Sequence, residues 1–535
     1  MTFRFAGAAV FTALLTTPTV AQTRIWRPDE RVVLRDYGFV HQVATTNEAV
    51  YAATAGGLIV YNALFDRWLP PLTELDGYPG GEVVTAMLGD RSDGSLWIGA
   101  VDEVVHYRPR MQLVERIPIG QLIETMFFDG SDPLSPLYLG TSTRQWFIIS
   151  PGSSIPVRVV QSPPSGSRAS GTSVQALLRV FPAADPLQAL VLSEGRRQYR
   201  LTSGAADPMN RMAYFGTDGL GLVRYDAGVA RLERLPYGLL ANGVGAVLLA
   251  DGGVWTGTTF GVPPRTLAGA PPYTPGFSWV STNLEESRLD RGPGTMGYGF
   301  RDVRDLARWE DQLWAATDAG VVPVGGGRSS PIDRQAGLPA NDVYALAPSP
   351  AGLWVGTSRG LALLGDGGAT VELAEVTTGA GVMIDALAVD GTGVWAGGPN
   401  GLLFLPAGTD RVAMPALTSG EPLLGDRVAA LAVVGRRVVV AIGDRILWRD
   451  ATGRWTHDTP LGLGPLTALA ADGDGVWVGG ELGVQYFTFD SREFQTAAGA
   501  GDLPARVRDL AASRDYLWAA TDGGLVRIEK RVVLR

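Results

Sequence analysis

Short runs of alternating apolar and polar residues, separated by Gly- and Asp-containing turns, fill most of this chain. In the run LWVGT at 353–357, Trp354 and Gly356 fall on one face and the other residues on the opposite face, which is the alternation of a β-strand. Dipeptides such as Asp390-Gly391 and Asp472-Gly473 stand before such runs, where hairpin turns favour them. Helical periodicity is absent after Ala21. The pattern therefore predicts an all-β protein.

A run of this kind returns at nearly constant spacing in the second half of the chain. Its key position falls successively at Trp314, Trp354, Trp395, Val439, Trp477 and Trp518. Weaker copies begin at Val50, Leu96, Leu137, Ala213 and Val254, and the stretch 139–213 does not fit a clean step. Each unit reads as four short antiparallel strands, which is typical of one blade of a β-propeller.

The recurring Trp has a structural explanation. Neighbouring blades stack face to face, and a Trp between them buries about 150–250 Å² of surface. The Gly two positions later lets the adjacent backbone approach. We therefore expect the Trp series to be core, and the alternative is an aromatic ligand platform.

The repeats predict two propellers in tandem, each with about six to seven four-stranded blades. The step from Trp255 to Trp314 is longer than any step within the second half of the chain and includes a Pro- and Gly-rich stretch at 263–298. We therefore place an N-terminal propeller at 22–275 and a C-terminal propeller at 276–535. The sequence RVVLR occurs at 31–35 and again at 531–535. Because an unpaired sheet edge is a liability, we expect a terminal strand to close a ring, with 531–535 as the fourth strand of the last blade.

The segment 1–21 reads as an export signal. Arg4 precedes an apolar stretch from Phe5 to Leu15, which is too short to span a bilayer, and Thr19 and Ala21 are small residues suited to a signal peptidase. We predict cleavage after Ala21 and a periplasmic or secreted protein. No later segment is a long apolar run, so no membrane span is expected.

Composition excludes several chemistries. The chain contains no Cys, three His and a single Lys, Lys530. Disulfides, thiolate metal sites and a Walker A loop are thereby excluded, and no cofactor or metal is expected. The net charge is −9 without a basic stripe, which argues against a nucleic-acid partner.

Two segments resemble a known repeat family. GLPANDVYALAPSPAGLWVGTSRGLALL at 337–364 and GDLPARVRDLAASRDYLWAATDGGLVRI at 501–528 are similar to the two-component regulator propeller repeat. In that family such repeats form paired propellers on the periplasmic side of hybrid sensor kinases, often sensing carbohydrate, and similar tandem propellers occur in a secretion-associated surface complex. This chain shows no kinase, so the resemblance implies signalling through a separate, membrane-bound partner.

Three functional classes follow. The first is an exported, non-enzymatic propeller that binds a ligand or protein, such as a glycan, a peptide or an envelope protein. The second is a cell-envelope or secretion-associated scaffold, and the third is a polysaccharide-active hydrolase or lyase. The G-x-S-x-G match around Ser358 lies inside the repeat and is followed by a strand instead of a helix, so it does not predict a nucleophile. His457 is expected in an exposed loop. We therefore name no catalytic residue.

Candidate ligand-binding residues come from the turns between the second and third strands of each blade. These turns share a face with the loops that enter the first strands, including Asn341 and Asp342. In the C-terminal ring they carry Asp318, Arg359, Asn400, Asp444, Glu481 and Asp522. Convergence around the axis would make a polar, mostly negative mouth suited to a cation, a basic peptide or a hydroxyl-rich glycan. The alternative is turn chemistry, because Asp and Asn tolerate the backbone of tight turns.

Overall fold

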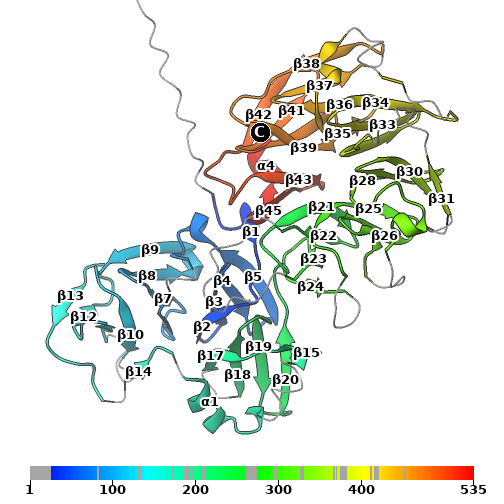
Figure 1. Cartoon of the computed structure of the whole chain (residues 1–535). Helices are drawn as coiled ribbons and strands as arrows, with labels where there is room; N and C mark the ends of the chain where they lie inside the picture. The colour runs from blue at the N-terminus through cyan, green and yellow to red at the C-terminus, as the bar shows by residue number, and fades with distance from the viewer. Residues whose placement is uncertain are drawn as a thin grey trace, which may run out of the picture.

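The computed structural model describes residues 24–534 except 25, 81–83, 129–134, 166, 172, 186–192, 195–196, 208–210, 261–273, 293–297, 326–330, 366–367, 369, 374–381, 410–412, 415–420 and 451. The predicted signal peptide at 1–21 lies outside these residues. Within them, eleven antiparallel sheets of three to five strands build two β-propeller rings (Figure 1). The predicted all-β, tandem-propeller fold is therefore confirmed.

Four sheets of the described residues form the N-terminal ring. Their first strands follow the order β10, β6, β2, β17, each packed against the next. The sheets are β2 (Val40–Thr45), β3 (Ala49–Thr54), β4 (Gly57–Asn62) and β5 (Arg67–Leu72); β6 (Ala86–Gly89), β7 (Leu96–Gly99), β8 (Glu103–Arg108) and β9 (Leu113–Pro118); β10 (Ile123–Phe128), β11 (Leu137–Thr141), β12 (Trp146–Ile149), β13 (Val157–Val159) and β14 (Arg168–Ala169); and β17 (Leu201–Ala206), β18 (Met212–Thr217), β19 (Leu222–Asp226) and β20 (Arg231–Leu235).

Residues between the third and fourth of these sheets depart from the blade pattern. Helix α1 (Val174–Val180) packs against β17, while β14 pairs with β10. A two-stranded ribbon, β15 (Ser193–Glu194) with β16 (Arg197–Gln198), follows. This is the stretch in which the sequence repeat loses its step. The sequence predicted six to seven blades for each ring. In the N-terminal ring, the described residues form four sheets.

Seven blades close the C-terminal ring. Their first strands pack in the order β21, β25, β28, β32, β35, β39, β43 and back to β21. The strands are β21 (Val244–Ala250), β22 (Gly253–Thr258), β23 (Phe277–Ser281) and β24 (Ser287–Asp290); β25 (Val303–Trp309), β26 (Gln312–Thr317) and β27 (Gly320–Pro323); β28 (Val343–Ser349), β29 (Gly352–Thr357), β30 (Gly360–Gly365) and β31 (Thr370–Leu373); β32 (Ala386–Asp390), β33 (Gly393–Gly398) and β34 (Gly401–Pro406); β35 (Val428–Val434), β36 (Arg437–Ile442), β37 (Arg445–Arg449) and β38 (Trp455–Asp458); β39 (Leu466–Asp472), β40 (Gly475–Gly480), β41 (Gly483–Thr488) and β42 (Glu493–Ala498); and β43 (Val507–Ala512), β44 (Tyr516–Thr521), β45 (Gly524–Glu529) and β1 (Arg31–Leu34).

The predicted boundary at 275/276 is wrong, because it cuts one blade. Strands β22 and β23 pair across it, from Gly253↔Ser281 to Gly257↔Phe277. The first strand of this blade, β21, packs against β25 and β43 of the C-terminal ring. The long step between Trp255 and Trp314 therefore reflects a long connection inside a blade, and the rings divide between β20 and β21.

A terminal strand does close the ring, but it is the other copy of RVVLR. Strand β1 pairs antiparallel with β45, from Arg31↔Ile528 to Leu34↔Leu525. The C-terminal copy enters a short helix, α4 (Lys530–Val533). The edge of β45 that we expected it to fill is occupied by β1, so the assignment of 531–535 to the fourth strand is wrong.

The recurring aromatic residues form the core between blades, as predicted. Trp477 and Trp518 have no exposed surface, and Trp395 is 2% exposed. The indole N–H of Trp477 donates to Asp472 Oδ2 at 2.7 Å, and that of Trp395 donates to Asp390 Oδ2 at 3.1 Å. The Asp of each Asp-Gly hairpin thus satisfies the indole as well as starting the turn.

Strand β1 also connects the two rings. Leu34 belongs to a buried cluster that contains residues of both rings, among them Trp68 and Trp518. Arg31, 3% exposed, donates to Asp76 Oδ1 and to the carbonyl of Leu75, both at 3.0 Å, in the N-terminal ring. In Figure 1, β1 and β45 lie where the rings meet.

Candidate functional site

One face of the C-terminal ring is formed by two sets of loops, as the sequence predicted. The Ser358 N–H, in the turn between β29 and β30, donates to the carbonyl of Asp342 at 3.0 Å, and the Asp522 N–H donates to that of Arg506 at 3.3 Å. Each bond ties a second-to-third turn to the loop that enters the first strand of its own blade. We call this surface the loop face.

Two of the six predicted residues are committed to bonds inside their own blades. Asp318 Oδ1 accepts the backbone N–H groups of Arg301 at 2.8 Å and Asp302 at 3.2 Å. Asp522 accepts the Nε–H groups of Arg506 and Arg508, both at 2.6 Å. Both carboxylates are half-buried. This geometry fits the turn-chemistry interpretation of the two residues.

The other four predicted residues, Arg359, Asn400, Asp444 and Glu481, are exposed in their turns. Asp444 Oδ1 lies 3.7 Å from Arg445 Nε. Of the six, Arg359 lines a hollow in the described surface. The six side chains therefore share a face without converging on one cavity.

β-Bulges redirect additional side chains at this face. The first strands of six blades shift register immediately after their first residue, and a bulge redirects the side chain that it carries. Arg304 and Arg508 occupy this position in β25 and β43. The signal in the sequence is VRDLA, which occurs at 303–307 and at 507–511.

Arginines compensate the acidic residues of the loop face. Arg304 Nη2 lies 3.3 Å from Asp342 Oδ1, and its guanidinium lies 4.1 Å from the centre of the Tyr344 ring. Arg427 Nη2 donates to Asp385 Oδ2 at 2.6 Å. Both pairs involve carboxylates of entry loops and not the acidic turn residues, so the predicted mostly negative mouth stays a prediction.

Asp385 retains an unused acceptor at this face. Burial raises the pKa of its carboxyl, against the opposing effects of Arg427 and Arg304. Its Oδ1 atom is buried and accepts no hydrogen bond from the described residues.

A polar hollow of about 580 Å³ lies on the loop face next to these charges. Its lining comes from the short helix η4 (Arg334–Ala336), the loop before β28 and the turn after β29: Asp333, Arg334, Gln335, Pro339, Ala340, Asn341, Asp342, Ser358 and Arg359. Asp333 Oδ1 accepts the N–H groups of Gln335 and Ala336. Among the described residues, no carboxylate pairs with the exposed side chains of Arg334 or Arg359. The hollow thus offers two available guanidinium groups.

The two residues that we did not name as catalytic, Ser358 and His457, lie in different blades. Ser358 occupies the turn between β29 and β30, and its N–H bonds Asp342. His457 is exposed on β38, the outermost strand of another blade. No three His, Cys, Asp or Glu side chains of the described residues are grouped so that they could hold a metal ion. None of the helices in the described part of the chain has the length and apolar character needed to cross a bilayer.

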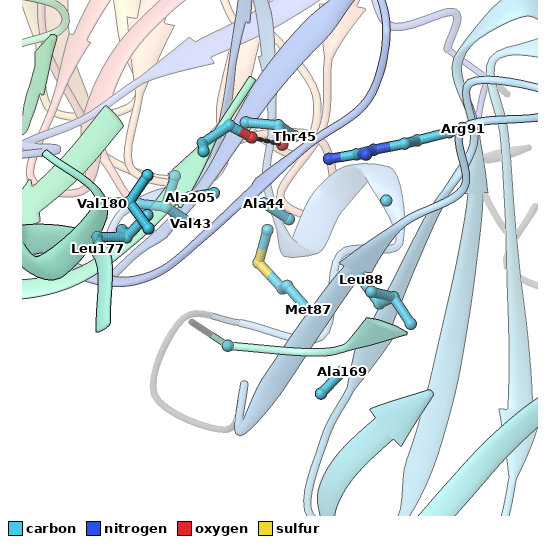
Figure 2. Close-up of a pocket in the computed structure, with 14 residues that line it drawn as sticks. Val43, Ala44, Thr45, Met87, Leu88, Arg91, Ala169, Leu177, Val180 and Ala205 are labelled. Carbon is cyan, nitrogen blue, oxygen red and sulfur yellow. Dashed lines mark hydrogen bonds between the residues drawn. The ribbon is translucent and has the colours of Figure 1, made fainter. Parts of the chain in front are cut away.

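The N-terminal ring contains a second, apolar hollow of about 250 Å³ (Figure 2). It lies at the ends of first strands β2, β6 and β17, beside α1 and β14. The lining residues are Val43, Ala44, Thr45, Met87, Leu88, Gly89, Arg91, Ala169, Gly171, Leu177, Val180, Gly204, Ala205 and Ala206. Part of the lining comes from the stretch 139–213, where no repeat could be fitted, so no sequence signal pointed to this hollow.

No family model and no curated protein matches this sequence. Among solved structures, the chain is similar to PorZ, an essential surface component of the type IX secretion system of Porphyromonas gingivalis. The identity is 12%, the match covers 94% of this chain and 87% of that one, and the TM-score is 0.55.

Looser similarities have TM-scores below 0.5. The extracellular domain of the hybrid two-component system BT3049 from B. thetaiotaomicron matches at 12% identity over 96% of this chain and 77% of that one, with a TM-score of 0.42. Virginiamycin B lyase from Staphylococcus aureus matches 54% of this chain and 94% of its own at 13% identity, with a TM-score of 0.40. At these identities the likeness is one of fold, and the chain shares the tandem β-propeller fold with PorZ.

Proposed function

We propose that this chain is an exported, non-enzymatic binding protein whose C-terminal ring recognises an acidic oligosaccharide at the loop face and acts through a separate partner. The observation that carries this proposal is the hollow of about 580 Å³ lined by charged and amide side chains, with Arg334 and Arg359 unpaired among the described residues. Guanidinium groups bind carboxylates through paired, charge-assisted hydrogen bonds.

Hydroxyl groups of the same ligand find complementary partners. Gln335 provides donors and an acceptor, and Asn341 provides donors, while its Oδ1 already accepts the Arg334 backbone N–H at 2.9 Å. Asp342, also in the lining, pairs with Arg304. Aliphatic and aromatic side chains are almost absent from the lining. A polyhydroxylated, negatively charged molecule fits this surface better than an apolar one.

The test is calorimetric titration of the mature protein with oligogalacturonate and, for comparison, with neutral malto-oligosaccharide. We expect saturable binding of the acidic oligosaccharide. The double variant Arg334→Gln/Arg359→Gln should weaken that binding at least tenfold, since a hydrogen bond to a charged group contributes about 1.5–3 kcal/mol. Arg436→Gln, at an exposed arginine in another blade, is the matched control. Unchanged affinity in the double variant would overturn the proposal, and cleavage of the oligosaccharide would indicate a hydrolase or lyase.

The second candidate function is a scaffold at the cell envelope. It is favoured by the shared architecture with PorZ across 94% of this chain, a likeness of fold. A scaffold would co-purify with envelope proteins and show no thermal stabilisation by oligogalacturonate, whereas a receptor gains stability with ligand concentration.

A further inference from the structure

The apolar hollow of the N-terminal ring differs from the polar hollow of the loop face in its lining. We propose that it takes a small amphipathic organic anion, with an apolar group in the hollow and a carboxylate on Arg91. The site lies in the other ring and uses none of the residues assigned to the oligosaccharide, so either proposal stands or fails without the other.

The walls define the apolar part of this ligand. Figure 2 shows Leu177 and Val180 of α1 on one side of the hollow and Leu88 on another, with Met87 reaching in between. Its volume of about 250 Å³ exceeds the roughly 150 Å³ of an apolar cavity that holds benzene and falls below the roughly 300–1,000 Å³ of drug-sized pockets. One aromatic ring with a short aliphatic chain matches this size. Met side chains adapt to ligands of varied shape.

Arg91 defines the polar part. Of the lining residues that the structure describes, it is the one that carries a charge, and its side chain is exposed. No carboxylate in the described part of the chain pairs with its guanidinium, while its carbonyl accepts the Asn47 side-chain amide at 2.8 Å. The Thr45 hydroxyl already donates to the carbonyl of Ala206 at 2.7 Å. The positive charge is therefore the main polar feature open to a ligand, and it selects an anion.

The position of the hollow supports a site separate from the loop face. Val43–Thr45, Met87–Gly89 and Gly204–Ala206 are the last residues of their strands. Loops that enter the first strands lie at the opposite ends of those strands. The anion site thus opens toward the face of the N-terminal ring that carries first-to-second turns.

The experiment titrates the mature protein with 4-phenylbutyrate and with its uncharged analogue 4-phenylbutanol, followed by ligand-observed NMR and thermal shift. We expect saturable binding of 4-phenylbutyrate, with at least tenfold weaker binding of the alcohol. Arg91→Gln should weaken the carboxylate about tenfold and leave the alcohol unchanged. Val180→Asp, at a wall position that is 58% exposed, should weaken the carboxylate as strongly, because it adds a negative charge at the rim.

Two matched controls separate the site from general surface effects. Arg436→Gln removes an exposed arginine of the other ring, and Val160→Asp adds a carboxylate at a fully solvent-exposed valine, 99% exposed. Neither should alter the binding of 4-phenylbutyrate. No saturable binding, equal binding of acid and alcohol, or binding that survives both Arg91→Gln and Val180→Asp would overturn the proposal.

Discussion

Closure of the C-terminal ring by β1 can be tested with the two copies of RVVLR, which provide a substitution and its control within one chain. Leu34 has no exposed surface and lies in the cluster that joins the rings. Leu534, at the same place in the C-terminal copy, is half-buried at the edge of a different cluster. Replacing each leucine separately with Ala tests which copy of RVVLR closes the ring.

The magnitudes differ because the surroundings differ. Leu34→Ala removes a fully buried side chain and leaves a cavity, which costs about 2–5 kcal/mol. Leu534→Ala removes side-chain surface that is only partly buried, and about 1 kcal/mol is expected from the transfer energy. With a urea m-value of about 3 kcal/mol/M, a loss of about 3 kcal/mol lowers the unfolding midpoint by about 1 M.

Urea unfolding followed by tryptophan fluorescence is a suitable assay, because Trp518 shares the cluster with Leu34. If the rings unfold in separate steps, the step that reports Trp518 is the one to compare. The reasoning is refuted if Leu534→Ala lowers the midpoint as much as Leu34→Ala does, or if Leu34→Ala leaves it unchanged.

Three further predictions concern carboxylates and the blade core. Asp305 and Asp509 have pKa values raised to about 7 and about 6, chiefly by burial and, for Asp305, also by the neighbouring Asp509. The folded state holds these protons more tightly than the unfolded chain, so the free energy of unfolding should fall as pH rises from about 4 to about 7, and Asp305→Ala should flatten that part of a pH–stability profile. Asp318→Ala should lower stability in urea by about 1–2 kcal/mol, because two backbone N–H groups lose their acceptor, while oligogalacturonate affinity measured by calorimetry stays constant; lost affinity with unchanged stability would instead assign Asp318 to the site. Trp477→Ala should cost about 3–5 kcal/mol in thermal or urea unfolding, and a loss below about 1 kcal/mol would contradict its role between blades.

The blade pattern was predictable because it depends on local chemistry. A Trp two positions before a Gly or Ala, a Thr at the strand end and a Gly after the turn recur in the clearest units. In the structure the Thr357 hydroxyl donates to the carbonyl of Gly360 at 2.9 Å, and Thr521 does the same to Gly524 at 2.6 Å. Gly360 has a φ of 133°, which disfavours other residues. These hydrogen bonds and turn residues each lie within a single hairpin. The same short sequence pattern therefore marks each blade that contains it.

Ring membership was not predictable in the same way, because it depends on contacts between distant first strands. Nothing local in residues 244–290 distinguishes a last blade of one ring from a first blade of the next. The Pro- and Gly-rich composition near 263–298 fitted a linker and also fits a long connection between β22 and β23. The two copies of RVVLR have equal strand propensity, and only the position of each relative to β45 decides which one pairs.

The candidate site was partly predictable for a related reason. The turn residues could be aligned blade by blade, which placed Arg359 on the loop face, where it lines the polar hollow. Arg304 and Arg427 pair with Asp342 and Asp385 of the entry loops. They come from a bulge and from an entry loop, whose direction depends on the closed ring. Asp385 likewise lies against Arg427 and within reach of the charge of Arg304 from another blade. Alignment of one turn class therefore identified the loop face but not the arginines that pair with its entry-loop carboxylates.

Ring closure also links the two propellers in folding. Strand β1 pairs with β45 across nearly the whole chain, and the entropy cost of closing a loop grows by about 0.6 kcal/mol for each doubling of its length. Residues just after β1 bond to the N-terminal ring, where Gly221 N–H donates to the carbonyl of Gly38 at 2.8 Å and Phe39 pairs with Asp218. Once that ring has formed, β1 is held beside the blade that begins at Val244, since both contribute to one buried cluster. Strand β1 then has only a short distance to travel before it pairs with β45. An N-terminal ring that folds first therefore lowers the entropy cost of closing the C-terminal ring. The shared cluster stabilises both rings.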